Sequence, residues 1–113
     1  METTDPVERQ LQAYNARDLE AFLAAYADDC VIVDAAGTPL MQGKEAMRER
    51  YGRLFADSPQ LHSTLRSRVR VGSHVFDEEH VTGMNLAGMP PELHAMVVHR
   101  IDDGLIRSVR LYL

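Results

Sequence analysis

The fold of this chain is decided by one stretch, Tyr26-Ala27-Asp28-Asp29-Cys30-Val31-Ile32-Val33-Asp34-Ala35-Ala36-Gly37, in which a helical pattern gives way to a strand. Two adjacent acids, Asp28 and Asp29, break the apolar spacing of the residues before them. The β-branched run Cys30–Asp34 then predicts a short buried strand that ends in an acid. Residues 35–39, Ala-Ala-Gly-Thr-Pro, predict a turn. A helical segment therefore leads directly into an inner strand.

Two helices are predicted before this stretch. Asp5 and Pro6 suit the start of the first one, because aspartate caps free backbone N–H groups and proline fits the first helical position. Asp18 is a second candidate N-cap. Apolar residues then recur at helical spacing, at Val7, Leu11 and Tyr14 in the first helix and at Leu19, Phe22, Leu23 and Tyr26 in the second. We expect a helical hairpin that ends near Tyr26.

The remainder of the chain changes from helical to strand periodicity. A third helix is predicted at residues 44–55, with a solvated face at Arg48, Arg50 and Arg53. Strands are predicted at residues 40–42, 65–71, 75–82, 92–101 and 105–113. The last strand has apolar residues on both faces, so we expect it to be central or covered. Helices followed by a run of antiparallel strands predict an α+β domain, in which helices pack on one face of a curved sheet.

The predicted strand at 65–71 alternates apolar residues with Arg66, Arg68 and Arg70. This pattern is typical of a strand with one wet face, here the arginine face. The next strand carries a run of acids, Asp77–Glu79. We therefore expect cross-strand pairs between these arginines and acids, each worth a few tenths of a kcal/mol to about 1 kcal/mol.

The composition bounds the class of protein. The 113 residues are enough for a single domain, residues 1–113, with one core. A net charge of -5 argues against nucleic acid as a partner. Apolar runs of only a few residues predict no membrane-spanning segment. The start, Met1–Asp5, lacks the basic and apolar regions of a signal peptide, which favours a cytoplasmic location.

Four segments carry a family resemblance: the quoted stretch 26–37, Tyr14–Phe22, Gln42–Met47 and Arg100–Ile106. In this order they resemble the steroid delta-isomerase-like and SnoaL-like proteins of the nuclear transport factor two-like superfamily, over nearly the whole chain. The resemblance implies a cone-shaped, cystatin-like α+β roll, in which a curved antiparallel sheet wraps around the N-terminal helices and leaves a deep apolar pocket. It also implies a small hydrophobic ligand and a homodimer formed through the sheet. Superfamily members include isomerases, cyclases, dehydratases, epoxide hydrolases and non-catalytic binding domains, so the fold alone selects no function.

Asp34 is the first candidate for a catalytic residue. It matches the position of the proton-abstracting acid in the steroid isomerases. It also alternates with Ile32, so it would share a face with a core residue, where desolvation raises the pKa of a carboxyl group. The alternative is an aspartate that begins the Ala35–Gly37 turn and accepts hydrogen bonds from backbone N–H groups. Both interpretations stay open at this point.

The oxyanion donors of the steroid isomerases are altered here. The resemblance places Gln10 and Val97 where those enzymes have a tyrosine and an acid. Losing one such donor costs about 100- to 1,000-fold in rate, so steroid isomerase activity itself is not expected. Gln10 is expected on a solvated helix face, and the alternative is that its side chain offers an amide donor.

His99 is the second candidate for a catalytic residue. It lies two residues from Val97 and so shares its strand face, which the resemblance places toward the pocket. It would act as an acid, a base or a ligand-orienting donor. The alternative is a buried histidine that hydrogen-bonds to Tyr14 or Tyr26. The predicted pocket wall consists of Tyr14, Phe22, Tyr26 and Val97, whereas Tyr51 and Tyr112 are expected to pack without such a role.

No cofactor or metal site is expected. The five histidines lack the spacing of a zinc site, and the single cysteine, Cys30, is expected to be a buried structural thiol. Two functions therefore stay open. One is a protein that binds a small hydrophobic molecule, with acid–base chemistry of the isomerase, dehydratase or cyclase type on Asp34. The other is a non-catalytic ligand-binding or dimerisation module.

Overall fold

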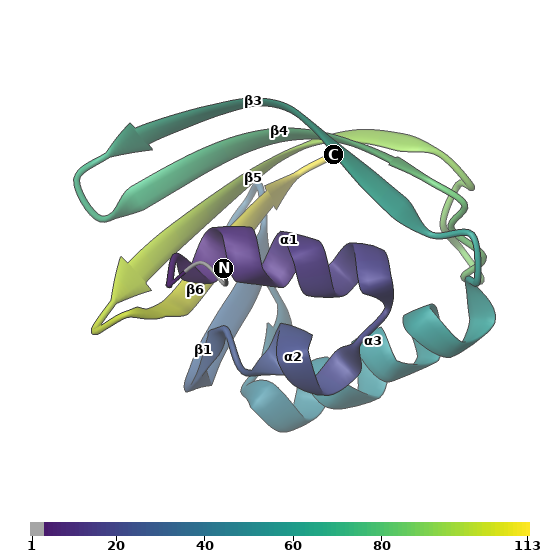
Figure 1. Cartoon of the computed structure of the whole chain (residues 1–113), viewed down its shortest axis with the longest axis horizontal. Helices are drawn as coiled ribbons and strands as arrows, with labels where there is room; N and C mark the ends of the chain where they lie inside the picture. The colour runs from purple at the N-terminus through teal and green to yellow at the C-terminus, as the bar shows by residue number, and fades with distance from the viewer. Residues whose placement is uncertain (1–3) are drawn as a thin grey trace.

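The computed structural model describes residues 4–113 and forms one curved sheet with three helices in its concavity (Figure 1). Residues 1–3, on which the expectation about a signal peptide partly rests, lie outside the described residues. In chain order the elements are α1 (Pro6–Ala16), α2 (Leu19–Leu23), β1 (Tyr26–Asp34), β2 (Pro39–Gln42), α3 (Lys44–Asp57), β3 (His62–Val71), β4 (His74–Thr82), β5 (Leu93–Asp102) and β6 (Leu105–Tyr112). The described part of the chain contains no helix long and apolar enough to cross a membrane.

Both predicted N-caps are present. The Asp5 carboxylate accepts from the Val7 N–H at 3.0 Å, and Asp18 accepts from the Ala21 N–H at 3.2 Å. The predicted end of the second helix is wrong, because α2 ends at Leu23 and Tyr26 begins β1. Sheet pairing explains the difference, since Tyr26 pairs with Ile106 of β6. Backbone groups that would extend the helix are used in the sheet instead.

The sheet has the order β2-β1-β6-β5-β4-β3. β6 lies between β1 and β5, which confirms the central position predicted from its two apolar faces. The predicted fold class is confirmed, a curved sheet of six strands around helices. One pair, β1 with β6, is parallel, and the other four pairs among the described strands are antiparallel. Figure 1 shows β3, β4 and β5 arching over α1, with α2 and α3 on the other side of that helix.

The core is centred on the Phe22 ring, which is 1% exposed. Its centroid lies 4.6 Å from that of Tyr51, 5.0 Å from Tyr26, 5.5 Å from Phe55 and 6.1 Å from Tyr14. Burying one such side chain contributes about 1.5–3 kcal/mol. The cluster joins all three helices to β1, and it holds the helices at a fixed distance from the sheet.

The predicted solvent face of β3 is wrong beyond Leu65. A bulge between Leu65 and Ser67 shifts the pairing with β4 by one residue. Because side chains alternate along a strand, such a shift exchanges the two faces. Val69 and Val71 are therefore 56% and 61% exposed, whereas Arg68 turns toward α1 and lies within 3.2 Å of the Glu8 carboxylate.

Only one of the expected arginine–acid pairs between β3 and β4 forms. Arg68 donates two hydrogen bonds to the Asp77 carboxylate, from Nε at 2.6 Å and from Nη2 at 2.9 Å. Arg66 instead contacts the His80 ring, and Arg70 pairs with Asp5 at the start of α1. The bulge moves the arginines out of register with the other acids, and this leaves Glu79 without an arginine partner.

Candidate functional site

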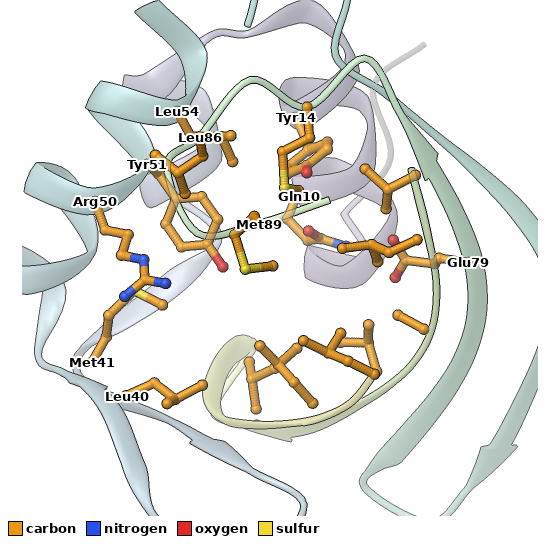
Figure 2. Close-up of a pocket in the computed structure, with 18 of the residues that line it drawn as sticks. Gln10, Tyr14, Leu40, Met41, Arg50, Tyr51, Leu54, Glu79, Leu86 and Met89 are labelled. Atoms are coloured by element: carbon orange, nitrogen blue, oxygen red, sulfur yellow. The ribbon is translucent and has the colours of Figure 1, made fainter. Parts of the chain in front are cut away.

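A cavity of about 350 Å³ lies between the helices and the concave face of the sheet (Figure 2). Its wall is mainly apolar and includes Phe22, Met41, Leu54, Val81, Met84, Leu86, Met89, Leu93, Ala95, Val97, Val109 and Leu111. The volume is within the usual range for sites that bind small molecules. The curvature of the sheet produces it, because the helices fill only part of the concavity.

The loop between β4 and β5 closes part of the cavity. Met84, Leu86 and Met89 of this loop line it. Asn85 ties the loop to the end of α3, since its N–H donates to Ser58 Oγ at 2.9 Å and its Nδ2 donates to the Asp57 carbonyl at 3.1 Å. The loop therefore has a defined position over the apolar wall.

The loop begins at Gly83, whose φ of +74° favours glycine. A Cβ at this position would lie 2.1 Å from the Gln60 carbonyl oxygen, which is far inside contact distance. Only glycine fits this approach between the loop and the segment before β3.

Three tyrosines bring hydroxyl groups to the apolar wall. Burial raises the pKa of Tyr14, Tyr26 and Tyr51, so these phenols are neutral across the physiological range. The Tyr26 hydroxyl donates to Gln10 Oε1 at 3.3 Å, and Gln10 Nε2 donates to the Val7 carbonyl at 3.0 Å. The expectation of a solvated Gln10 is wrong, because its side chain points into the concavity of the sheet and is 6% exposed.

Two residues of α3 also reach the cavity, against expectation. The Tyr51 ring lines it, and Figure 2 shows its hydroxyl directed toward the interior. Arg50, expected on a solvated face, is exposed but also lines the cavity, with its guanidinium beside Met41 (Figure 2). The cavity therefore extends along α3 beyond the apolar face that helical periodicity predicts.

Asp34 begins the turn, as one of the two interpretations predicted, and it also lines the cavity. Its Oδ1 accepts from the Ala36 and Thr38 N–H groups, both at 2.9 Å, so it does begin the turn. The residue also lines the cavity and is half-buried. Among the described residues, none donates a hydrogen bond to its other oxygen, Oδ2. The turn thus fixes the carboxylate while leaving one oxygen available.

His99 is 1% exposed and lines the cavity from β5. Burial lowers its pKa to about 4, and the nearby Asp77 only partly opposes this effect. The imidazole is therefore neutral at pH 7. Neither Tyr14 nor Tyr26 hydrogen-bonds to it, and within residues 4–113 its Nδ1 has no hydrogen-bond partner.

Glu79 is the functional candidate that reasoning from the sequence missed. It lines the cavity, is 8% exposed, and accepts a hydrogen bond of 2.6 Å from Ser63 Oγ to Oε1. Desolvation raises its pKa, and Asp77 adds to that effect. The sequence contained a usable signal, because Val75, Asp77, Glu79 and Val81 stand at every second position of the strand and therefore share one buried face.

The sequence profile of the SnoaL-like domain matches residues 7–109. The chain belongs to the SnoaL-like family. No curated protein matches it in sequence.

Solved structures share the SnoaL-like fold of this chain. An uncharacterised cystatin-fold protein from Novosphingobium aromaticivorans has a TM-score of 0.84 at 25% identity, covering 98% of this chain and 97% of its own. A putative polyketide cyclase from Sinorhizobium meliloti has a TM-score of 0.76 at 19% identity, covering 95% and 93%. An LEH-like epoxide hydrolase from M. tuberculosis has a TM-score of 0.75 at 20% identity, covering 95% and 78%. At 19% and 20% identity the likeness shows the fold alone.

Within this SnoaL-like cavity the structure brings together every residue predicted for the site. Asp34, His99, Tyr14, Phe22, Tyr26 and Val97 all line it. Their part in binding or chemistry stays a prediction. In the described part of the chain, no group of three or more His, Cys, Asp or Glu side chains is arranged to hold a metal ion.

Proposed function

We propose that this SnoaL-like protein binds a small hydrophobic molecule in the cavity and carries out acid–base chemistry on it with Asp34. The observation that supports this proposal is the cavity itself. Its volume is about 350 Å³, its wall is mainly apolar, and a few polar groups from different elements converge on it. Sites for small molecules have this composition, since apolar walls supply affinity and a few polar groups orient the ligand.

The role of Asp34 follows from its hydrogen bonds. Two backbone N–H groups hold Oδ1, so the carboxylate cannot rotate freely, and Oδ2 is available for a proton of the ligand. The substrate would carry an acidic C–H or a hydratable group at this end. His99 would orient the ligand as a neutral imidazole, because a pKa of about 4 makes it a poor cationic acid at pH 7.

Steroid isomerisation is not part of the proposal. Val97, at one of the two donor positions implied by the resemblance, has no group that can donate a hydrogen bond. At the other position, Gln10 Nε2 donates to the Val7 carbonyl and Oε1 accepts from Tyr26. An enolate would therefore lose most of the stabilisation that such donors provide.

Binding is tested with a neutral apolar probe, naphthalen-1-ylmethanol, by isothermal titration calorimetry. Val97→Phe adds volume inside the cavity, and Val98→Phe adds the same volume on the other face of β5. We expect the wild type and Val98→Phe to bind the probe and Val97→Phe to lose binding. Equal binding by both variants would place the probe elsewhere and refute the proposal.

The chemical step is tested by exchange of the α-protons of 2-tetralone in D₂O, followed by NMR. The wild type is expected to accelerate exchange, and Asp34→Asn to abolish the acceleration while still binding the ketone. Exchange that continues unchanged in Asp34→Asn would rule out this carboxylate as the base. No acceleration by the wild type would leave the binding proposal in place without the chemistry.

A second candidate function, a dimerisation module, rests on the outer face of the sheet. Val69, Phe76 and Val98 occupy neighbouring positions in one row across β3, β4 and β5, and Val71 beside them is 61% exposed. An apolar row of this kind is suited to pairing with a second copy of the sheet. Sedimentation velocity at micromolar concentration tests it. A monomer would contradict the proposal, and a dimer that Val69→Asp dissociates would support it.

A further inference from the structure

Among the described residues, no cation forms an ion pair with Glu79, an acid that lines the cavity. Its neighbour on β4, Asp77, accepts two hydrogen bonds from the Arg68 guanidinium of β3. The same guanidinium also donates to the Glu8 carboxylate of α1. Glu79 receives one hydrogen bond, from Ser63 to Oε1. Among the described residues, none donates to Oε2, and Figure 2 shows the carboxyl group directed into the cavity.

The position of this carboxyl group is fixed by a chain of hydrogen bonds from α1. Asn15 Nδ2 donates to the Ser63 carbonyl at 3.0 Å, and the Ser63 N–H donates to Asn15 Oδ1 at 2.7 Å. The Ser63 hydroxyl in turn holds Glu79 at 2.6 Å. A side chain held in this way presents Oε2 at one place in the cavity, as a binding site for a hydrogen-bond donor requires.

Aromatic rings line the same cavity as this oxygen. Tyr14, Phe22 and Tyr51 all line the same cavity, and the ring centroid of Phe22 is 6.1 Å from Tyr14 and 4.6 Å from Tyr51. A cation is attracted to the faces of such rings, by about 0.5–2 kcal/mol. An ammonium group would therefore gain both a carboxylate partner and aromatic neighbours here.

We propose that the ligand of this cavity is a small apolar amine, whose ammonium group donates to Glu79 Oε2 while its hydrocarbon part lies against the apolar wall. The proposal rests on the proposed function, binding of a small hydrophobic molecule, and names the chemical class of that molecule. A buried carboxylate without a counter-ion is costly, and a cationic ligand removes that cost on binding. A charge-assisted hydrogen bond is also about twice as strong as a neutral one.

The test compares two probes of nearly the same shape by isothermal titration calorimetry at pH 7.5: naphthalen-1-ylmethylamine, which is cationic, and naphthalen-1-ylmethanol, which is neutral. We expect the amine to bind about tenfold more tightly, a difference of about 1.4 kcal/mol. Glu79→Gln is expected to remove this preference. The matched control is Glu78→Gln, the adjacent acid on the outer face, bound to Ser67 and His94, and it should retain the preference.

A pH series on the wild type tests the same point without a substitution at Glu79. Protonation of this carboxyl group removes the charge, so the preference for the amine should decline as the pH is lowered from 7.5, and burial raises the pKa at which this occurs. Asp77 and Arg68 from the sheet act on Glu79, as do Tyr14, Tyr26 and Tyr51 from α1, β1 and α3. Asp34, Arg50 and His99 also line the cavity, and His99 stays neutral above pH 5 because burial lowers its pKa to about 4. The tyrosines stay neutral over this range, since burial raises the pKa of each.

The outcomes separate this proposal from the one on which it rests. If the alcohol binds as tightly as the amine, or if Glu79→Gln keeps the preference, the amine proposal is overturned and the hydrophobic cavity remains a binding site. Tighter binding of the alcohol would mean that Glu79 acts as a neutral donor, which also overturns it. If neither probe binds the wild type, both proposals fail.

Discussion

The buried imidazole of His99 makes the stability of the protein depend on pH. The ordinary pKa of histidine, about 6.5, applies to the unfolded chain, and burial lowers it to about 4 in the folded state. Above pH 6.5 both states are neutral at this residue and it contributes no pH dependence. As the pH falls from 6.5 to 4, the unfolded chain takes up a proton that the folded protein does not. Stability is therefore lost in this window, and the loss is complete near pH 4.

The size of the effect follows from the shift. The difference between 6.5 and about 4 is about 2.5 pKa units, and each unit corresponds to about 1.36 kcal/mol, giving about 3 kcal/mol. Glu79 acts in the opposite direction, because its pKa is raised and the folded protein binds its proton more readily. The contribution of His99 is therefore measured as the difference in unfolding free energy between the wild type and a His99 variant, because both proteins contain Glu79.

The assay is urea unfolding of the wild type and of His99→Gln at pH 7, 6, 5 and 4. Glutamine does not titrate, so the wild type should lose about 3 kcal/mol more than His99→Gln between pH 7 and pH 4. His62→Gln is the control, since His62 is an exposed histidine at the start of β3. It should retain the wild-type pH dependence. Parallel curves for the wild type and His99→Gln would refute the argument that burial keeps this imidazole neutral.

Three further predictions concern stability and reactivity. Arg68→Met leaves Asp77, which is fully buried, without its counter-ion, so urea unfolding should show a loss of about 3–5 kcal/mol, and a loss below 1 kcal/mol would contradict it. Gly83→Ala should cost more than about 1 kcal/mol, because its Cβ would lie 2.1 Å from a carbonyl oxygen, whereas Gly88→Ala, with a similar φ and open space, should cost less in the same thermal melt. Burial raises the pKa of Cys30 to about 12, so this thiol should react with Ellman's reagent at pH 8 only as the protein unfolds, and rapid labelling of the native protein would be inconsistent with that burial.

Local signals in the sequence predicted the helices better than the strand edges. Asp5 and Asp18 have the predicted capping roles, because a cap depends on residues only a few positions apart. Tyr26 fits helical spacing but belongs to β1, since its pairing partner Ile106 lies 80 positions away in the chain (106 - 26). The bulge after Leu65 has no local signature, and it reversed the predicted faces of β3. Pairing between distant strands decided each element that the sequence placed wrongly.

In the candidate site, too, local patterns predicted some residues and missed one whose burial depends on a neighbouring strand. Asp34 and His99 were predicted from alternation along a strand and from the family resemblance, and both line the cavity. Glu79 was assigned to a cross-strand pair because it stands in a run of charged residues, a pattern that usually marks a solvated face. Its burial depends on two features outside that run: Val75 and Val81 share its face, and the bulge in β3 removes its arginine partner.

The two inward acids of β4 differ in a way that helps to locate the site. Both are buried, and burying either one costs stability unless it is neutralised. Asp77 has Arg68 as a counter-ion, which is the arrangement of a structural ion pair. Among the described residues, the one hydrogen-bond donor to the Glu79 carboxyl group is the Ser63 hydroxyl, although a leucine or methionine at this position would fill the cavity at no electrostatic cost. An uncompensated acid that is fixed in place and directed into an apolar cavity is more readily explained by a ligand that completes it than by folding.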